Sequence, residues 1–391
     1  MLANMDNSQQ IIKGKRLNSL DFFRGATVAS MIWVNNPGSW SYIYGPFAHA
    51  EWHGWTPTDL IFPFFLFIVG VSIVLALSKA TAKGMSRQEL IQKTAIRGVK
   101  IFGLGLVLAA FPYVVFSPEF SLHPKIESLR IPGVLQRISV IYIMAAFLFL
   151  YTSNKVRWIV SGVILIGYWL AMSLIPVPGF GAGAIDAPEG NIAAYIDQLL
   201  LSGHMWKELW DPEGILSTFP ALVSTLIGIY IGQLLLKDHI NQEQKVLEVL
   251  KWGFFWLTLG YLWSWIFPLN KNIWTSSFSL FTGGLASMIF GFCYWFIDVK
   301  GHKKGVKWGI AFGINAITIF FLSGLIARIM SMIQITVEGN LMSLKGFLYS
   351  VILKGIFTDP MLASVSHSIL WVILFFGLAS WMQQKDILIK V

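Results

Sequence analysis

The stretch DLIFPFFLFIVGVSIVLAL at residues 59–77 decides the fold. After Asp59 it contains no charged residue, and the next one in the chain is Lys79. A helix needs about 20 mainly apolar residues to cross the hydrocarbon core of a bilayer. The stretch therefore predicts a membrane-spanning helix, and further runs of the same kind lie on both sides of it.

The composition of the whole chain agrees with this prediction. Of the 391 residues 55% are hydrophobic and 13% are charged, whereas soluble domains carry roughly 25% charged residues. Such a chain has too little polar surface to fold as a soluble enzyme. The net charge of +9 comes from short basic runs between apolar stretches, so we expect no nucleic-acid partner. The sequence predicts an all-α integral membrane protein.

About ten apolar runs are long enough to cross a bilayer once flanking residues are included. Only the first of them is weak, because Asp21 and Arg24 lie in its opening turn. The predicted spans are 21–36, 59–77, 98–116, 132–151, 157–175, 214–236, 252–268, 274–297, 308–331 and 361–382.

The positive charges fix the predicted orientation. With the N-terminus in the cytoplasm, 20 of the 29 Lys and Arg residues fall in cytoplasmic connections and 6 in outer ones, as the positive-inside rule requires. We expect both termini in the cytoplasm, with a tail at 1–20, a transmembrane domain at 21–383 and a second tail at 384–391.

Two outer loops, 37–58 and 176–213, are long and carry polar clusters, which is where function tends to lie. The apolar segment 340–357 contains Lys345 and Lys354. We interpret it as an interfacial or re-entrant helix on the outer face, although an eleventh span is the alternative.

Polar residues inside predicted spans need a reason, because hydrocarbon disfavours them. Asp21 and Arg24 fit either a local ion pair or an anion site open to the cytoplasm. Arg137 lies at least one helical turn inside its predicted span. Its side chain either faces a polar cavity or extends back to the membrane surface. His367, in the last predicted span, is interpreted as a hydrogen-bonded core residue.

A polar group is expected where the first span ends. Asn35 and Asn36 fit a helix C-cap or a site that polarises a carbonyl. His49 of HAEWHG lies nearby, together with Asp59 at the start of the next span. A histidine beside a carboxylate at a membrane boundary suits proton transfer or nucleophilic attack. A zinc site at His49 and His53 lacks a third ligand, so no metal is expected.

The motifs around these residues are those of a known family. They are RLNSLDFFRG (16–25), VNN (34–36), FAHAEWHGWTPTDLIFPFFLFIVG (47–70), RIPGVLQR (130–137), PVPG (176–179), AAYIDQLLL (193–201), DPEGIL (211–216) and NKNIW (270–274). In this order the chain resembles the heparan-alpha-glucosaminide N-acetyltransferase family, of the bacterial type without the large luminal domain. SLDFFRG also resembles the opening of the wider group of membrane acyltransferases.

This resemblance implies transfer of an acetyl group from cytoplasmic acetyl-CoA to the amine of a glucosamine unit across the membrane. The family's active-site histidine matches His49, and its asparagine at the end of the first span matches Asn35. His49 then acts as general base or carries the acetyl group transiently. The amide of Asn35 or Asn36 holds the developing oxyanion, and Asp59 orients the imidazole.

The remaining site residues are expected to bind the two substrates. Arg24, Arg137 and Gln136 are assigned to acetyl-CoA, whose phosphates suit cationic partners. The acceptor side is assigned to Arg130, Asp211, Glu213, Lys271 and Asn272.

The acceptor is expected to be an amino sugar, free or within a cell-wall or surface glycan. We further expect a multi-pass protein of the bacterial inner membrane, with a homodimer implied by the resemblance alone. The alternative function is a transporter or flippase for a sugar or a lipid-linked glycan, which would need neither acetyl-CoA nor His49.

Overall fold

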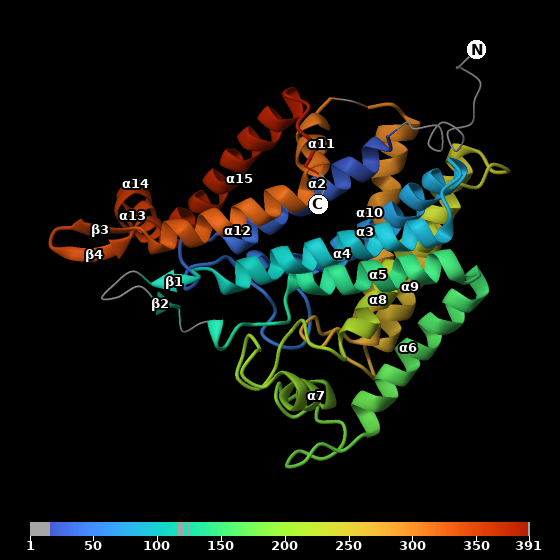
Figure 1. Ribbon diagram of the computed structural model, residues 1–391, viewed down its shortest axis with the longest axis horizontal. Helices are drawn as coiled ribbons and strands as arrows, with labels where there is room; N and C mark the ends of the chain where they lie inside the picture. Colours follow the sequence, from blue (N-terminus) through green and yellow to red (C-terminus); the bar gives the residue numbers. More distant parts are fainter. Residues whose placement is uncertain (1–15, 116–120, 124–125, 303, 390–391) are drawn as a thin grey trace.

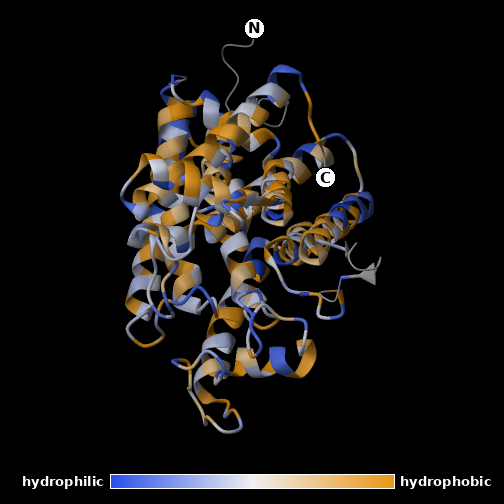
Figure 2. Cartoon of the chain, turned by 90° about the vertical axis from the view of Figure 1, so that its left-hand side faces the viewer, coloured by the Kyte–Doolittle hydropathy of each residue, from blue (hydrophilic) through white to orange (hydrophobic). Residues whose placement is uncertain are grey.

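A computed structural model describes residues 16–389 apart from 116–120, 124–125 and 303 (Figure 1). The two predicted tails therefore lie partly outside the described residues. Long helices make up most of this part of the chain, and Figure 2 shows hydrophobic residues along the helices and hydrophilic ones mainly in the connections.

The elements follow one another with mostly short connections. The helices are α2 (Asn18–Asn35), α3 (Pro57–Ala82), α4 (Arg87–Ala110), α5 (Val134–Tyr151), α6 (Asn154–Leu174), α7 (Ile192–Leu201), α8 (Thr218–Leu235), α9 (Gln242–Trp263), α10 (Ser276–Cys293), α11 (Lys307–Ile314), α12 (Ala316–Met332), α13 (Leu344–Phe347), α14 (Lys354–Ile356) and α15 (Pro360–Gln384). A 3-10 turn η1 (Gly45–Phe47), two π-helical turns η3 (Tyr294–Val299) and η4 (Leu348–Leu353), and strands β1 (Val114–Val115), β2 (Ser121–Leu122), β3 (Gln334–Val337) and β4 (Asn340–Ser343) complete them.

Each of the predicted spans overlaps a helix, and 308–331 overlaps two, but the predicted number of ten spans is not confirmed. In the described part of the chain, 6 helices are long and apolar enough to cross a membrane, or 7 if α11 and α12 form one broken span. The three other predicted spans coincide with α2, α4 and α9, which have 18, 24 and 22 residues. These three contain more polar or charged residues, so length and composition alone do not make them spans.

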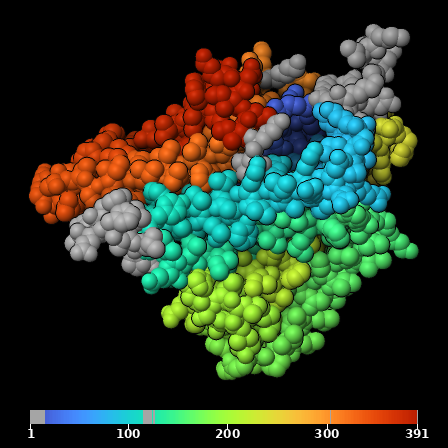
Figure 3. Space-filling view, in the orientation of Figure 1, coloured from blue at the N-terminus to red at the C-terminus, as the bar shows by residue number. Residues whose placement is uncertain are grey.

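Segment 340–357 is only partly helical. Residues 340–343 are strand β4, which pairs antiparallel with β3, so the helix predicted for these four residues was wrong. Glu338 and Gly339 have φ angles of 50° and 80°, and this tight turn sends the chain back along β3. Helical structure begins at α13 and ends with α14, and Figure 3 shows this region at one end of the molecule.

Helix α2 is fixed against α11 by small residues. A Cβ atom at Gly25 would lie 1.7 Å from the carbonyl oxygen of Gly309, and one at Gly313 would lie 2.0 Å from the carbonyl oxygen of Asp21. Only glycine permits such close backbone approach, which is a common way of packing helices in membranes. The two helices therefore form one rigid support for the residues on α2.

The break between α11 and α12 holds the C-terminal segment of the chain. The two helices meet at an angle of 80°, with Asn315 between them. The Asn315 side chain donates a hydrogen bond to Ile387 O (2.9 Å) and accepts one from Ile389 N (3.0 Å). The end of the chain after α15 is thereby attached to the α11–α12 break.

Three connections meet at one end of the helices, which we call the loop face: residues 36–56, 175–217 and 264–275. Trp52 Nε1 donates to Ile185 O at 2.8 Å, and Gly54 N donates to Leu269 O at 2.7 Å. In Figure 1 helix α7 and its flanking loops lie at this end. The loop face thus brings together the two loops in which the sequence placed the site.

Candidate active site

The loop face contains a histidine paired with a buried carboxylate. His49 Nδ1 lies 2.6 Å from Asp59 Oδ1, which confirms the predicted proximity. The Asp59 side chain is 1% exposed, whereas that of His49 is 48% exposed. Because Nδ1 faces a carboxylate it carries the proton, and Nε2 remains available to accept one.

Local structure holds Asp59 in place. It lies in the first turn of α3 and forms a capping box with Thr56. Asp59 Oδ2 accepts hydrogen bonds from Thr56 N and Ala50 N, both at 3.0 Å. One carboxylate therefore begins the helix, fixes the preceding loop and orients the imidazole.

The two asparagines at the end of α2 differ in environment. Asn36 is buried and caps the helix, since its Nδ2 donates to Ile32 O at 2.8 Å. The backbone carbonyl oxygen of Asn36 accepts from His367 Nδ1 (2.9 Å) and from Ser368 Oγ (3.1 Å). His367 is thus a hydrogen-bonded core residue, as predicted. Asn35 is exposed, so its amide is the more accessible of the two.

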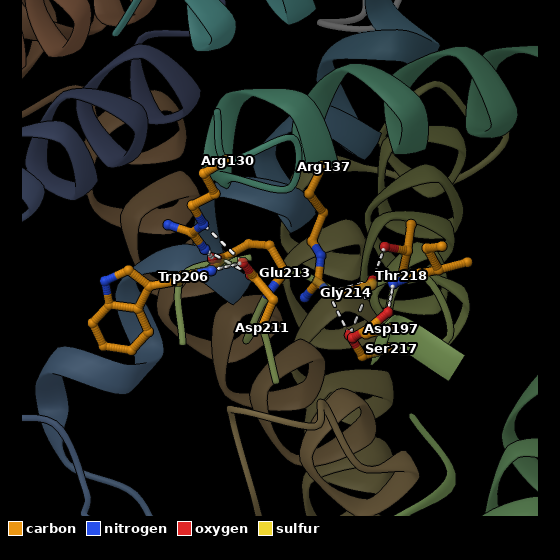
Figure 4. A network of polar contacts seen from close by, with 10 residues as sticks. Arg130, Arg137, Asp197, Trp206, Asp211, Glu213, Gly214, Ser217 and Thr218 are labelled. Carbon is orange, nitrogen blue, oxygen red and sulfur yellow. Dashed lines mark hydrogen bonds and ion pairs between the residues drawn. The ribbon is translucent and has the colours of Figure 1, made fainter. Parts of the chain in front are cut away.

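A network of charged residues occupies the same end of the molecule (Figure 4). Arg130 Nε donates to Asp211 Oδ2 at 2.8 Å, and Nη2 donates to Asp211 Oδ1 at 2.6 Å and Glu213 Oε2 at 2.5 Å. Asp211 also accepts from Trp206 N and Glu213 N. Three of the predicted acceptor residues therefore bind one another and shape the 206–217 loop.

Arg137 is buried next to this network with part of its guanidinium unsatisfied. Its Nη2 donates to Gly214 O at 3.0 Å and Ser217 Oγ at 2.5 Å. Nε and Nη1 are buried without a hydrogen-bond partner, and the guanidinium lies 5.5 Å from the ring of Trp274. Arg137 therefore does not extend back to the surface, and it retains donors for a ligand.

Asp197 of α7 is a second buried carboxyl at this end. It accepts from Ile215 N at 2.9 Å, and a Cβ atom on Gly214 would lie 1.8 Å from its Oδ2. Burial raises the pKa of Asp197 to about 7, and the nearby Asp211 adds to this effect. The sequence did not assign a role to Asp197, because the sequence pattern does not show whether an acidic residue in a helix is buried.

The raised pKa of Asp197 predicts a pH-dependent stability. An aspartate in the unfolded chain has a pKa of about 3.9. Between that pH and about pH 7, Asp197 therefore keeps a proton in the folded chain that it has lost in the unfolded chain. The free energy of unfolding should fall as pH rises through this interval. Asp197→Asn should reduce that slope, measured as thermal unfolding midpoints between pH 5 and pH 8. An unchanged slope would contradict this origin.

Lys271 and its neighbours close the site from the 264–275 loop. Burial lowers the pKa of Lys271, while Glu213 and Asp59 act to raise it. The side chain of the adjacent Asn270 lies beside His53, with 3.3 Å between Asn270 Nδ2 and His53 Nδ1. The other ring nitrogen of His53, Nε2, lies 2.8 Å from Asp186 Oδ1. The two histidines of HAEWHG thus contact different acids.

Two predictions remain, concerning the acceptor residue Asn272 and a metal site. Asn272, the fifth residue assigned to the acceptor, is partly exposed beside Lys271. Within the described residues no group of three His, Cys, Asp or Glu side chains could hold a metal ion.

A cavity of about 210 Å³ lies between α2, α3, α4, α5 and the α11–α12 break. Arg24 and Arg97 line it, with Ser72, Tyr142 and Ile389. Arg24 donates to Asp21 (3.1 Å), Ser72 Oγ (3.0 Å) and Gly313 O (3.2 Å). Arg24 thus forms the predicted ion pair with Asp21 and also lines a cavity, while an anion site open to the cytoplasm stays a prediction.

The three residues assigned to acetyl-CoA do not meet at one point. Arg24 lines the cavity, whereas Arg137 contacts the 214–217 segment on the loop face. Gln136 is buried between α5 and α4, since a Cβ atom at Gly105 would lie 2.3 Å from its Oε1. The sequence did not predict that Arg97 lines the cavity, because Arg97 was counted only among the cytoplasmic positive charges.

Comparison with known proteins decides the family. The sequence model named heparan-alpha-glucosaminide N-acetyltransferase, catalytic, matches residues 16–260. The chain belongs to this family. The human heparan-alpha-glucosaminide N-acetyltransferase is 31% identical over 362 aligned residues, which cover 78% of this chain and 52% of the human protein. The mouse protein is 29% identical, with 78% and 53% covered.

The chain spans about half the length of these N-acetyltransferases. The matched region contains α2 to α8 and most of α9, and with them His49, Asp59 and the Arg130 network. The family membership predicted from the motifs is thereby confirmed.

Proposed function

We propose that this protein transfers an acetyl group from acetyl-CoA to the amine of a glucosamine-type sugar across a membrane. The observation that carries the proposal is the His49–Asp59 pair at 2.6 Å, in a chain of the N-acetyltransferase family. A half-exposed imidazole whose Nδ1 is held by a buried carboxylate has Nε2 free for proton transfer or attack.

Two reaction sequences are compatible with this geometry. In direct transfer the amine nitrogen attacks the thioester carbonyl carbon, His49 takes the amine proton, and the C–S bond breaks to release CoA, which receives that proton. In the two-step sequence His49 Nε2 attacks the thioester carbonyl carbon, and the C–S bond breaks to release CoA as the thiolate. The amine then attacks the acetyl carbon, the bond between that carbon and Nε2 breaks, and the amine proton passes by way of His49 to the CoA thiolate or to water. In both, we propose that the oxyanion accepts from the amide of Asn35, which is exposed, whereas the Asn36 amide already donates to Ile32 O.

We propose that the phosphate-bearing part of the donor enters the cavity, whose volume of about 210 Å³ holds only part of a molecule of this size. Arg24 and Arg97 supply positive charge for phosphate groups at one end. Ile138, which lines the cavity, follows Arg137 in the chain. The acyl end of the donor would thus approach Gln136 and Arg137, whose free guanidinium nitrogens suit a carbonyl oxygen.

The acceptor is proposed to bind on the loop face, between His49 and Lys271. Arg130, Asp211 and Glu213 form the wall of this site rather than its contact surface, because their charges already bind one another. We propose that the loop face lies outside the cytoplasm, as the distribution of positive charges indicates. The membrane is proposed to be the inner membrane of a bacterium. A homodimer is retained as part of the proposal.

The proposal is tested with the purified full chain in detergent, incubated with acetyl-CoA and either glucosamine or glucose. Free thiol and acetylated sugar should rise together with glucosamine only, since glucose lacks the amine. Binding of CoA without product would redirect the search to another acceptor. A chain that neither binds nor consumes acetyl-CoA would contradict the proposal and favour solute transport.

The donor site makes a separate prediction. Arg97→Ala should raise the KM for acetyl-CoA by about 10- to 150-fold with little change in kcat, because a charge-assisted contact to phosphate is worth roughly 1.5–3 kcal/mol. Arg97 is chosen over Arg24 because Arg24 also bonds to three neighbours. The control is Arg87→Ala, an exposed residue at the start of α4. Equal KM values in the two variants would remove Arg97 from the donor site.

A further inference from the structure

A second cavity, of about 400 Å³, lies against the opposite side of α2. Its lining includes Ala26, Ser30 and Val34 of α2, together with Phe47, Pro57 and Trp308. Apart from Ser30 and Thr58 the residues that line this cavity are apolar, and Ser30 is exposed. We call this cavity the α2 groove. At 3.6 residues per turn Ala26 is rotated by roughly 200° from Arg24, so the groove and the donor cavity lie on opposite faces of one helix.

The groove runs along α2 from the loop face. From Ala26 to Val34 a helix rises about 12 Å, and half of a hydrocarbon core is about 15 Å. Trp308 lies at the end of the groove away from the loop face, where its ring packs edge-on against the ring of Phe22 with a centroid distance of 5.3 Å. The groove therefore accommodates part of a single aliphatic chain that enters from the loop face and runs along α2 toward Trp308.

The shallow end of the groove leads to the active-site pair. Phe47 lies two residues before His49, and Pro57 lies two residues before Asp59. Trp33 packs against Phe47 with a centroid distance of 5.3 Å, and Thr58 Oγ1 donates to Pro46 O at 3.3 Å. A head group carried by a chain in the groove would thus be held next to His49.

We propose that the acceptor is a lipid-linked amino sugar, whose aliphatic chain lies in the α2 groove while its glucosamine head group reaches His49. This inference rests on the proposed function and specifies its substrate class. The donor and the acceptor would approach the same histidine along opposite faces of α2. Anchoring the acceptor in this way raises its effective concentration at the site without any additional polar contact.

The test uses the full chain in phosphatidylcholine nanodiscs with acetyl-CoA and either dodecyl glucosaminide or glucosamine. The wild-type kcat/KM should favour the dodecyl sugar by about tenfold or more. Ser30→Trp fills the groove and should abolish this preference while leaving glucosamine turnover intact. Val163→Trp is the matched control, because Val163 is 66% exposed on α6, and it should retain the preference. Equal use of both sugars by the wild type, or a preference that survives Ser30→Trp, would overturn the proposal.

A second readout does not depend on turnover. A dodecyl glucosaminide with a diazirine in its chain should label residues 26–34, and unlabelled dodecyl glucosaminide should compete better than dodecyl glucoside. Equal competition by the two would mean that the groove holds ordinary bilayer lipid, which overturns the proposal. Absence of acetylation of either sugar would contradict the proposed function, and the labelling would then decide the groove separately.

Discussion

Replacing His49 with alanine is expected to reduce acetyl transfer by at least about 10²–10⁴-fold, the usual contribution of a positioned general base. The imidazole is the titratable group that the structure orients through a 2.6 Å contact with buried Asp59. Nothing else on the loop face has both this orientation and this exposure among the residues described. The measurement is release of free thiol from acetyl-CoA in the presence of glucosamine.

His53→Ala is the matched control for this loss. His53 is in the same loop and contacts Asp186 and Asn270 instead of Asp59, so its variant should keep most of its turnover. Equal loss in both variants would mean that the loop, and not the His49 imidazole, is required. A burst of thiol in wild type without acceptor, equal to the protein present, would identify His49 as a carrier of the acetyl group.

Asp211→Ala should destabilise the protein by about 3–5 kcal/mol, the usual result of breaking a buried ion pair. The Asp211 side chain is fully buried. It accepts two bonds from Arg130, one from Trp206 N and one from Glu213 N. Its loss leaves a partly buried guanidinium with one remaining carboxylate and frees two backbone donors.

The stability measurement is the thermal unfolding midpoint in detergent, compared with Glu208→Ala. Glu208 is exposed in the same loop, so its removal should change the midpoint little. Midpoints that coincide in the two variants would show that the Arg130 network does not stabilise the fold. A normal midpoint with lost turnover would instead place Asp211 in contact with the acceptor.

The sequence predicted well those features that depend on local pattern. Apolar runs located every long helix, because hydrocarbon demands about 20 apolar residues in succession. The His49–Asp59 pair was also predictable, since a capping acid at the start of α3 faces the loop before it. The motifs identified the family for the same reason, as they are contiguous in the chain.

Features that depend on contacts between distant segments were not predictable. Arg97 and Tyr142 become cavity residues only when α4 and α5 pack beside α2. The role of Asn315, within predicted span 308–331, was not predicted. Its side chain binds a segment more than 70 residues further along the chain. The different environments of Asn35 and Asn36 follow from α15, which the sequence does not place.

The attachment of the C-terminal segment to Asn315 offers an optical reporter of the donor. Ile389 lines the cavity, while the neighbouring Leu388 is 49% exposed. The chain contains one cysteine, Cys293, and it is buried. A cysteine introduced at position 388 can therefore be labelled selectively with an environment-sensitive dye. The change in its emission on adding CoA would follow donor binding in real time, without any acceptor present.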